Sequence, residues 1–271
     1  MDFSLRRVGK ENLHYYESDQ ESKTQLVFVS GGFNPELWKH QIKYFSRKYK
    51  TVSYQPTQSF RDIEGERKAL NNILDQEQLT DVVLVSNFWG NSIAQEFQDH
   101  ENVRATVFTG ASRDMELKRR SLYNLFWKYG KKNPKILKKA VFADETNYNV
   151  VKEFAEDLEV PEYSDIKTFQ ENYRMERPQT PSLIIHNEDD IYETPKSFDE
   201  FLDFAKKYNL KITPVVKPEK DKDFEINNEA YTGEGYLYNS DFLDGLKVPN
   251  ESIIKTIEFL EKNNLGIKKT N

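Results

Sequence analysis

Residues 84–97 read LVSNFWGNSIAQEF, and this stretch does more than any other to decide the fold. It starts with apolar, β-branched residues that favour a strand and continues with apolar residues at helical spacing. The small residues Ser86 and Gly90 flank Phe88 at the point where the period changes. A sharp strand-to-helix turn needs small residues at such positions, because larger side chains would collide there. The stretch therefore predicts a strand, a tight turn and a buried helix.

Short apolar runs of the same kind recur on both sides of this stretch. They show little polar alternation, as is typical of strands buried on both faces of a parallel sheet. The runs cover residues 25–32, 51–56, 82–87, 105–110, 182–188 and 211–216. Amphipathic stretches that favour helices cover residues 34–45, 62–76, 194–204 and 250–265. This alternation predicts an α/β fold, with a mostly parallel central sheet, helices on both faces and a leading hairpin over 3–8 and 12–17.

The alternation breaks between residues 113 and 179, where helical patterns follow one another without a strand. We expect residues 1–112 and 180–271 to form the core and residues 113–179 to form a helical cap insertion over one end of the sheet. Between residues 118 and 139 the insertion carries nine basic residues, interleaved aromatic residues and no acidic residue. The stretch that follows it is acidic.

Two interpretations of this charge pattern remain open. In the first, the aromatic side chains bury against the core, and the basic and acidic halves of the insertion pair with each other. In the second, the insertion docks on an anionic lipid surface or an acidic partner. The basic side chains that would do so are Lys128, Lys131, Lys132, Lys135, Lys138 and Lys139.

The composition excludes several classes of protein. A formal net charge of -6 argues against nucleic acid as the main partner, because phosphate binding needs a basic footprint. The chain has no cysteine, which excludes disulfides, thiolate catalysis and cysteine metal sites. It has no apolar run near the ~18 residues of a membrane span and no apolar signal core in its first residues. We expect a cytoplasmic protein without a transmembrane segment or a cofactor.

The turn in residues 84–97 resembles the nucleophile elbow of the α/β-hydrolase family, which reads G-x-S-x-G between a strand and a helix. Phe88 stands in the nucleophile position. Residues 27–33 are similar to the family strand and loop that carry His-Gly and supply an oxyanion-hole amide. In this chain Ser30 stands in the histidine position, followed by Gly31 and Gly32.

Two later segments resemble the places of the other triad residues. Residues 183–195 are similar to the strand that ends in the triad acid, and the acid position falls on Asp190. Residues 233–240 resemble the loop that reads Gly-His in the family, and Tyr236 takes the histidine position. One family loop that is usually rich in glycine reads QPTQSF here, so the resemblance is carried by the order of the segments more than by each position.

These positions predict that the usual chemistry is lost. A phenylalanine side chain has no group that can attack a carbonyl, and a tyrosine with a pKa of about 10 cannot replace imidazole as a base near neutral pH. Of the three triad positions, only Asp190 keeps the family residue. We expect none of the four histidines to lie at the carboxyl end of a strand facing the elbow; they are His14, His40, His100 and His186.

The resemblance therefore implies a catalytically inactive α/β-hydrolase-like protein. It would bind a small apolar or acyl-bearing ligand, or a protein partner, through the former active-site cleft and the cap. The residues expected at the cleft are Ser30, Gly31, Gly32, Phe33, Phe88, Trp89, Asp190 and Tyr236. The alternative is a hydrolase of the ester or amide class with a rearranged site, which would use Ser86 or Ser92.

A metal site is not expected. The acidic segment 221–229 lacks the glycine and the closing glutamate that an EF-hand loop needs. The cluster at 188–190 has no histidine at the spacing that a metal site requires.

Overall fold

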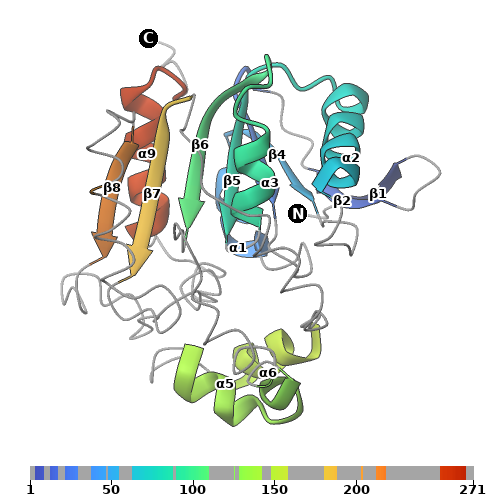
Figure 1. The fold of residues 1–271 in the computed structure, drawn as a ribbon, viewed down its shortest axis with the longest axis vertical. Coiled ribbons are helices and arrows are strands. Elements are labelled where there is room, and N and C mark those ends of the chain that lie inside the picture. Colours follow the sequence, from blue (N-terminus) through green and yellow to red (C-terminus); the bar gives the residue numbers. More distant parts are fainter. Residues whose placement is uncertain are drawn as a thin grey trace.

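An eight-stranded sheet organises the computed structural model of this chain (Figure 1). The structure describes residues 4–8, 13–17, 22–29, 38–46, 48–54, 63–87, 90–109, 125, 128–141, 148–157, 180–187, 203, 212–217 and 251–266. The strand order is β1-β2-β4-β3-β5-β6-β7-β8. The strands are β1 (Ser4–Val8), β2 (Leu13–Glu17), β3 (Gln25–Val29), β4 (Lys50–Tyr54), β5 (Val82–Asn87), β6 (Val103–Thr109), β7 (Ser182–Asn187) and β8 (Ile212–Lys217).

The first two strands form the expected hairpin, and the rest of the sheet is parallel. Ser4 of β1 pairs with Glu17 of β2 in antiparallel register, and β2 pairs antiparallel with β4. From β4 through β3, β5, β6 and β7 to β8, all neighbouring strands run parallel. The sheet and its flanking helices confirm the predicted α/β class.

Each apolar run of the sequence forms a strand, with ends that differ by a few residues from the prediction. The run predicted at 105–110 starts too late, because β6 begins at Val103. Arg104 interrupts the apolar pattern there. Its exposed guanidinium pairs with Asp81 while its backbone stays in the sheet. Val103 before it is buried again, so the single exposed Arg104 cut the predicted run short.

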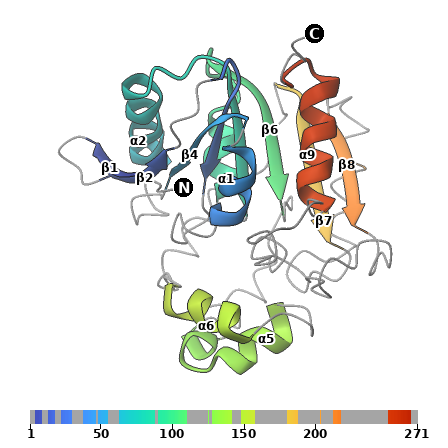
Figure 2. The same cartoon turned by 180° about the vertical axis from the view of Figure 1, so that it is seen from behind.

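The helices lie on both faces of the sheet. They are α1 (Lys39–Phe45), α2 (Ile63–Gln76), α3 (Gly90–Glu96), α5 (Pro134–Val141), α6 (Tyr148–Asp157) and α9 (Glu251–Lys262). Helices α2 and α3 cover one face (Figure 1), and α1 and α9 cover the other (Figure 2). Helices α5 and α6 lie away from the sheet, beyond the carboxyl ends of the parallel strands (Figure 1). The helix expected at 194–204 falls outside the described residues, apart from the helical Asp203.

Strand β3 shows why these strands are apolar throughout. Successive side chains of a strand point to opposite faces of a sheet. Val27 and Val29 belong to the buried cluster that includes residues of α2 and α3. Phe28 lies instead against α1, with its ring centroid 5.2 Å from that of Trp38 and 6.3 Å from that of Phe45. Because both faces are covered, every position of the strand is buried and apolar residues follow one another without interruption.

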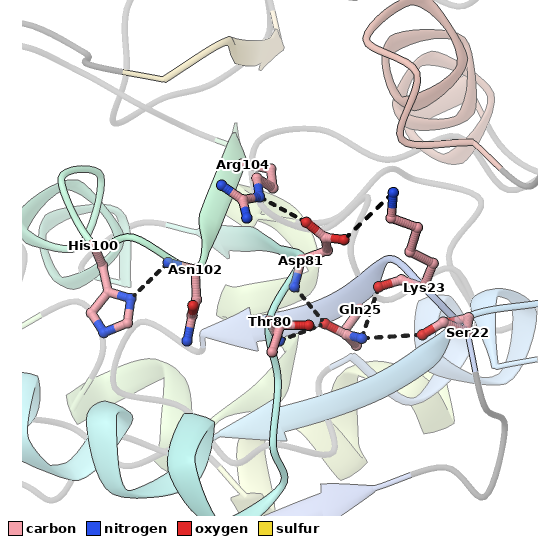
Figure 3. A network of polar contacts seen from close by, with 8 residues as sticks. All are labelled: Ser22, Lys23, Gln25, Thr80, Asp81, His100, Asn102 and Arg104. Carbon is pink, nitrogen blue, oxygen red and sulfur yellow. Dashed lines mark hydrogen bonds and ion pairs between the residues drawn. The ribbon is translucent and has the colours of Figure 1, made fainter.

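Polar side chains tie the amino ends of three strands together (Figure 3). The Oε1 atom of Gln25 accepts hydrogen bonds from the backbone amides of Thr80 (3.1 Å) and Asp81 (3.0 Å). The carboxylate of Asp81 in turn lies 2.7 Å from Nε of Arg104 and 3.9 Å from Nζ of Lys23. These contacts join the starts of β3, β5 and β6 at the edge of the sheet that is opposite to the elbow.

Candidate functional site

The chain turns from strand to helix at the place that the elbow interpretation requires. Strand β5 ends at Asn87 and helix α3 begins at Gly90, so Phe88 and Trp89 alone stand between them in the sequence. This strand–turn–helix context is the one that supports a nucleophile-elbow motif. The described residues of α3 that are buried are Gly90, Asn91, Ser92, Ile93, Ala94 and Gln95. The short helix is thus packed into the protein directly behind the turn.

Three buried side chains form a closed set of hydrogen bonds around this turn. Ser86 donates from Oγ to Oδ1 of Asn91 over 2.8 Å. Asn91 donates from Nδ2 to the backbone oxygen of Thr109 over 3.1 Å, and Thr109 donates from Oγ1 to the backbone oxygen of Ser86 over 2.8 Å. The orientation of the Asn91 amide follows from these partners, because a backbone carbonyl can only accept. We call these residues the elbow triangle; it joins the end of β5, the first turn of α3 and the end of β6.

The elbow triangle removes Ser86 from the list of nucleophiles. Its hydroxyl points at the Asn91 amide oxygen, with the Val107 backbone oxygen as a second acceptor at 3.4 Å. An amide oxygen cannot take up the hydroxyl proton near neutral pH, so neither partner is a general base. Ser86 is fully buried as well. Its side chain supports the shape of the turn.

Ser92, the other serine of the alternative mechanism, lies on α3 and is 1% exposed. Its Oγ has no hydrogen-bond partner in the part of the chain that the structure describes. A buried hydroxyl without a base beside it is not an activated nucleophile.

A buried pair of polar side chains lies near the same edge of the sheet. Tyr54 is the last residue of β4, and the register places it level with Val29 and, through Val29, with Ser86. Its hydroxyl donates a hydrogen bond to the carboxylate of Glu66 on α2, and both side chains are buried. Burial, followed by the charge of Glu66 and this hydrogen bond, raises the pKa of Tyr54 well above its ordinary value. The tyrosine therefore stays protonated and acts as a donor.

Glu66 stands in the first turn of α2, where the positive end of the helix dipole favours a carboxylate. Sequence reasoning missed the pair, because a tyrosine in a strand is equally typical of plain packing. The acidic residues of the first turn, Glu64 and Glu66, were the available signal.

The histidines lie at several places in the fold. His100 lies just before β6 at the amino edge, where its ring stacks on Phe97 at 5.6 Å and its Nδ1 accepts from the Asn102 amide. Val82, which pairs with the start of β6, precedes Ser86 by four residues, so that edge is about 13 Å from the elbow. His186 lies within the strand expected at 182–188, as the next-to-last residue of β7. His14 lies in β2 and His40 in α1.

The cleft residues expected from the sequence fall outside the described residues. They are Ser30, Gly31, Gly32, Phe33, Phe88, Trp89, Asp190 and Tyr236. The described strands place the points from which these segments leave the sheet. Val29, the last residue of β3, pairs with Ser86, and Asn87 pairs with Thr109. Segments 30–33 and 88–89 therefore leave neighbouring strands at the same edge, whereas Tyr236 stays a prediction that rests on the sequence.

Neither a membrane span nor a metal site emerges from the described parts of the chain. None of the helices there combines the length and the apolarity that crossing a membrane requires. No three histidine, cysteine, aspartate or glutamate side chains within the described ranges are grouped so that they could hold a metal ion. The acidic segments 188–190 and 221–229 lie outside those ranges.

Solved structures share this fold over nearly the whole chain. A thermophilic esterase from Thermogutta terrifontis superposes with a TM-score of 0.66, covering 97% of this chain and 99% of its own, at 11% identity. The enol-lactonase from Burkholderia xenovorans LB400 gives a TM-score of 0.68 over 95% of this chain and 100% of its own, also at 11% identity. These two enzymes are α/β-hydrolases. The chain therefore has the α/β-hydrolase fold, and at this identity the likeness shows the fold alone.

Sequence similarity points to leucyl-tRNA synthetases instead, and it covers only part of the chain. The family model described as "Leucyl-tRNA synthetase, editing domain" matches residues 194–261. The leucine–tRNA ligase of Mesorhizobium japonicum is 41% identical over 78 residues, which is 28% of this chain and 9% of the ligase. The ligase of Rhodospirillum centenum is 52% identical over 60 residues, or 21% of this chain and 7% of its own. The chain thus spans less than a tenth of the length of these curated relatives.

The local match overlaps the second half of the hydrolase-like core. Residues 194–261 include most of α9 and also segment 233–240, which we compared with the Gly-His loop. That segment therefore carries two resemblances, and the assignment of Tyr236 to the histidine position stays a prediction.

Proposed function

We propose that this protein binds an acyl-bearing ligand without hydrolysing it, at the edge of the sheet where β3, β5 and β6 end. The elbow triangle carries the proposal. It joins the end of β5 to the first turn of α3 and the end of β6, yet its serine hydroxyl is buried and bound to an amide oxygen. With Phe88 between strand and helix, the elbow supplies shape and apolar surface in place of a nucleophile.

The ligand class follows from chemistry that the two kinds of similar proteins share. The structural neighbours are named as an esterase and an enol-lactonase, both of which act on carboxylic esters. The local sequence match is to an editing domain, and editing by synthetases hydrolyses a mischarged aminoacyl product. An acyl group is common to these substrates. The apolar Phe88 and the glycines Gly31 and Gly32 would favour the same group here through an apolar contact and exposed backbone amides.

The position of α5 and α6 supports a cap over this edge. They lie beyond the carboxyl ends of the parallel strands (Figure 1), and the insertion predicted at 113–179 contains both helices. We propose that this region limits access to the site, as insertions at this end of an open parallel sheet are placed to do, because ligands bind outside the carboxyl ends of the strands.

Binding and turnover can be measured with one matched pair of probes. We expect the amide N-(4-nitrophenyl)butyramide to quench tryptophan fluorescence in a saturable manner. The ester 4-nitrophenyl butyrate should release 4-nitrophenol no faster than it does in buffer alone. Phe88→Asp should weaken binding of the amide at least about tenfold, because it puts a charge on an apolar surface. Asn72→Asp adds the same charge at an exposed position of α2, outside the proposed site and the cap, and should leave binding unchanged. Absence of saturable quenching would contradict the proposal.

The hydrolase alternative has one observation in its favour, which is the place of His186 at the carboxyl end of β7. Release of nitrophenol above the buffer rate would contradict a non-hydrolysing protein. Loss of that release in His186→Gln or Ser92→Ala, with an unchanged circular dichroism spectrum, would establish a rearranged hydrolytic site in its place.

A further inference from the structure

The large apolar side chains that are exposed in the described chain gather in one region. They are Leu125 at 51%, Tyr129 at 58%, Ile136 at 37% and Tyr148 at 40%. All of them belong to the segments on and around α5 and α6, whereas the apolar side chains whose burial the structure describes in β3 to β7 and in α2 are buried. Single exposed apolar residues are ordinary on a protein surface, but a gathering of them marks a surface of contact.

The same region carries several exposed basic side chains. Lys128, Lys131, Lys132 and Lys135 are exposed, and Lys138 is partly exposed. The sequence has no acidic residue between 118 and 139. A protein with a net charge of -6 therefore concentrates positive charge next to exposed apolar groups.

Helical geometry separates an inner side from an outer side. Gly130 is buried against Leu137, because a Cβ atom added to this glycine would lie only 2.3 Å from Cδ2 of Leu137. Residues 125, 128, 129 and 132 follow the i, i+3, i+4, i+7 spacing of one helical face, which is opposite to Gly130. Two apolar and two basic side chains thus share the outer face.

We propose that this outer face docks on the headgroup region of an anionic lipid bilayer. We call it the docking face and define it by Leu125, Lys128, Tyr129 and Lys132. Lysine stems can lie along apolar surface while the ammonium groups reach lipid phosphates, and tyrosine places an apolar ring and a polar tip at the same boundary. The apolar side chains insert into the interface and the lysines select negative charge, as in interfacial helices.

Nucleic acid fits these side chains less well. Single-stranded RNA is bound by stacking on several flat rings, and Tyr129 is the one ring among the four residues of the docking face. The segment with the docking face directly precedes α5, which lies beyond the carboxyl ends of the parallel strands (Figure 1), so docking would bring the acyl-binding edge near the bilayer. The inference stands on exposure and charge and does not depend on the proposed function.

The test is sedimentation of the full chain with vesicles of phosphatidylcholine alone or with about a third phosphatidylserine. We expect binding to the anionic vesicles only, and weaker binding at high salt. The variant Lys128→Glu/Lys132→Glu should reduce binding about tenfold or more, since each basic residue near the surface adds attraction. The matched control Lys48→Glu/Lys68→Glu makes the same charge change at exposed lysines of the core and should bind nearly as well as the unchanged protein.

A second variant separates insertion from charge alone. Leu125→Ser/Tyr129→Ser keeps the net charge and should still reduce binding several-fold, because the apolar contacts are lost. Equal binding to neutral vesicles, an equal loss in the Lys48→Glu/Lys68→Glu control, or no loss in Leu125→Ser/Tyr129→Ser would each overturn the proposal. Binding to polyuridylate RNA with no binding to anionic vesicles would overturn it in favour of nucleic acid.

Discussion

The parallel strands are held together in different ways at their two ends, which we call the amino edge and the carboxyl edge of the sheet. At the amino edge, Asp81 pairs with Arg104 and Lys23, whose side chains are 48% and 86% exposed. At the carboxyl edge, the elbow triangle and the Tyr54–Glu66 pair are all 3% exposed or less. Water can replace the partners at the first edge and cannot reach those at the second.

This difference determines how much stability the protein loses when a polar side chain at either edge is replaced. A buried polar group that loses its partner keeps the full cost of desolvation, whereas an exposed ion pair contributes little and is screened by salt. Ligands of open parallel sheets bind at the carboxyl edge. At this edge the buried hydrogen bonds of the elbow triangle fix the backbone. The elbow triangle thus supports the junction between β5 and α3.

The largest effect is expected from Asn91→Asp, which keeps the shape of the side chain and places an oxygen against the backbone oxygen of Thr109. The change removes a donor and buries a charge, so we expect the free energy of unfolding to fall by about 3 kcal/mol or more. Urea unfolding followed by circular dichroism measures it.

The control for that prediction is Asn72→Asp, the same change at an exposed position of α2. We expect it to alter stability by less than about 0.5 kcal/mol. If the two variants unfolded at the same urea concentration, the elbow triangle would not be the rigid support that we infer.

A smaller effect is expected from Tyr54→Phe, which leaves the buried Glu66 carboxylate without this donor. We expect a loss of about 1–3 kcal/mol at pH 7. Tyr129→Phe makes the same change at a side chain that is 58% exposed and should cost almost nothing.

The Tyr54–Glu66 pair also makes the free energy of unfolding depend on pH. The folded pKa of Tyr54 is raised above its unfolded value of about 10 by burial, by the charge of Glu66 and by their hydrogen bond. Its contribution is fully present below pH 10 and is lost as pH rises from there toward the folded pKa, since the unfolded chain releases the proton first. The difference in stability between the unchanged protein and Tyr54→Phe should therefore shrink between pH 9 and about pH 11. A difference that stayed constant over this range would show that Tyr54 does not carry the shift.

The strands were predictable because burial on both faces makes each strand segment apolar along its length. This pattern can be recognised in each segment alone. Val27, Phe28 and Val29 are apolar whichever helix covers them, so the run could be recognised without knowing the neighbours. The change from strand β5 to helix α3 was predictable for the same reason, since Ser86 and Gly90 mark it locally.

The polar supports of the site were not predictable, because they depend on which strands become neighbours. Asn91 and Thr109 are 18 residues apart and meet only because β5 lies beside β6. The exposure of Tyr129 also depends on tertiary packing, since an aromatic residue in a helical pattern fits a buried face equally well.

The smallest effect is expected at the amino edge, from Arg104→Gln. The guanidinium lies 2.7 Å from Asp81, but it is about half exposed, and the carboxylate keeps access to water and to Lys23. We expect a loss of about 0.2–1 kcal/mol at low salt, which should approach zero in about 1 M salt because exposed charges are screened. Asn91→Asp should keep most of its cost in the same salt, because its groups are buried. Urea unfolding of both variants at the two ionic strengths makes the comparison, and an equal response to salt would mean that the two edges do not differ in kind.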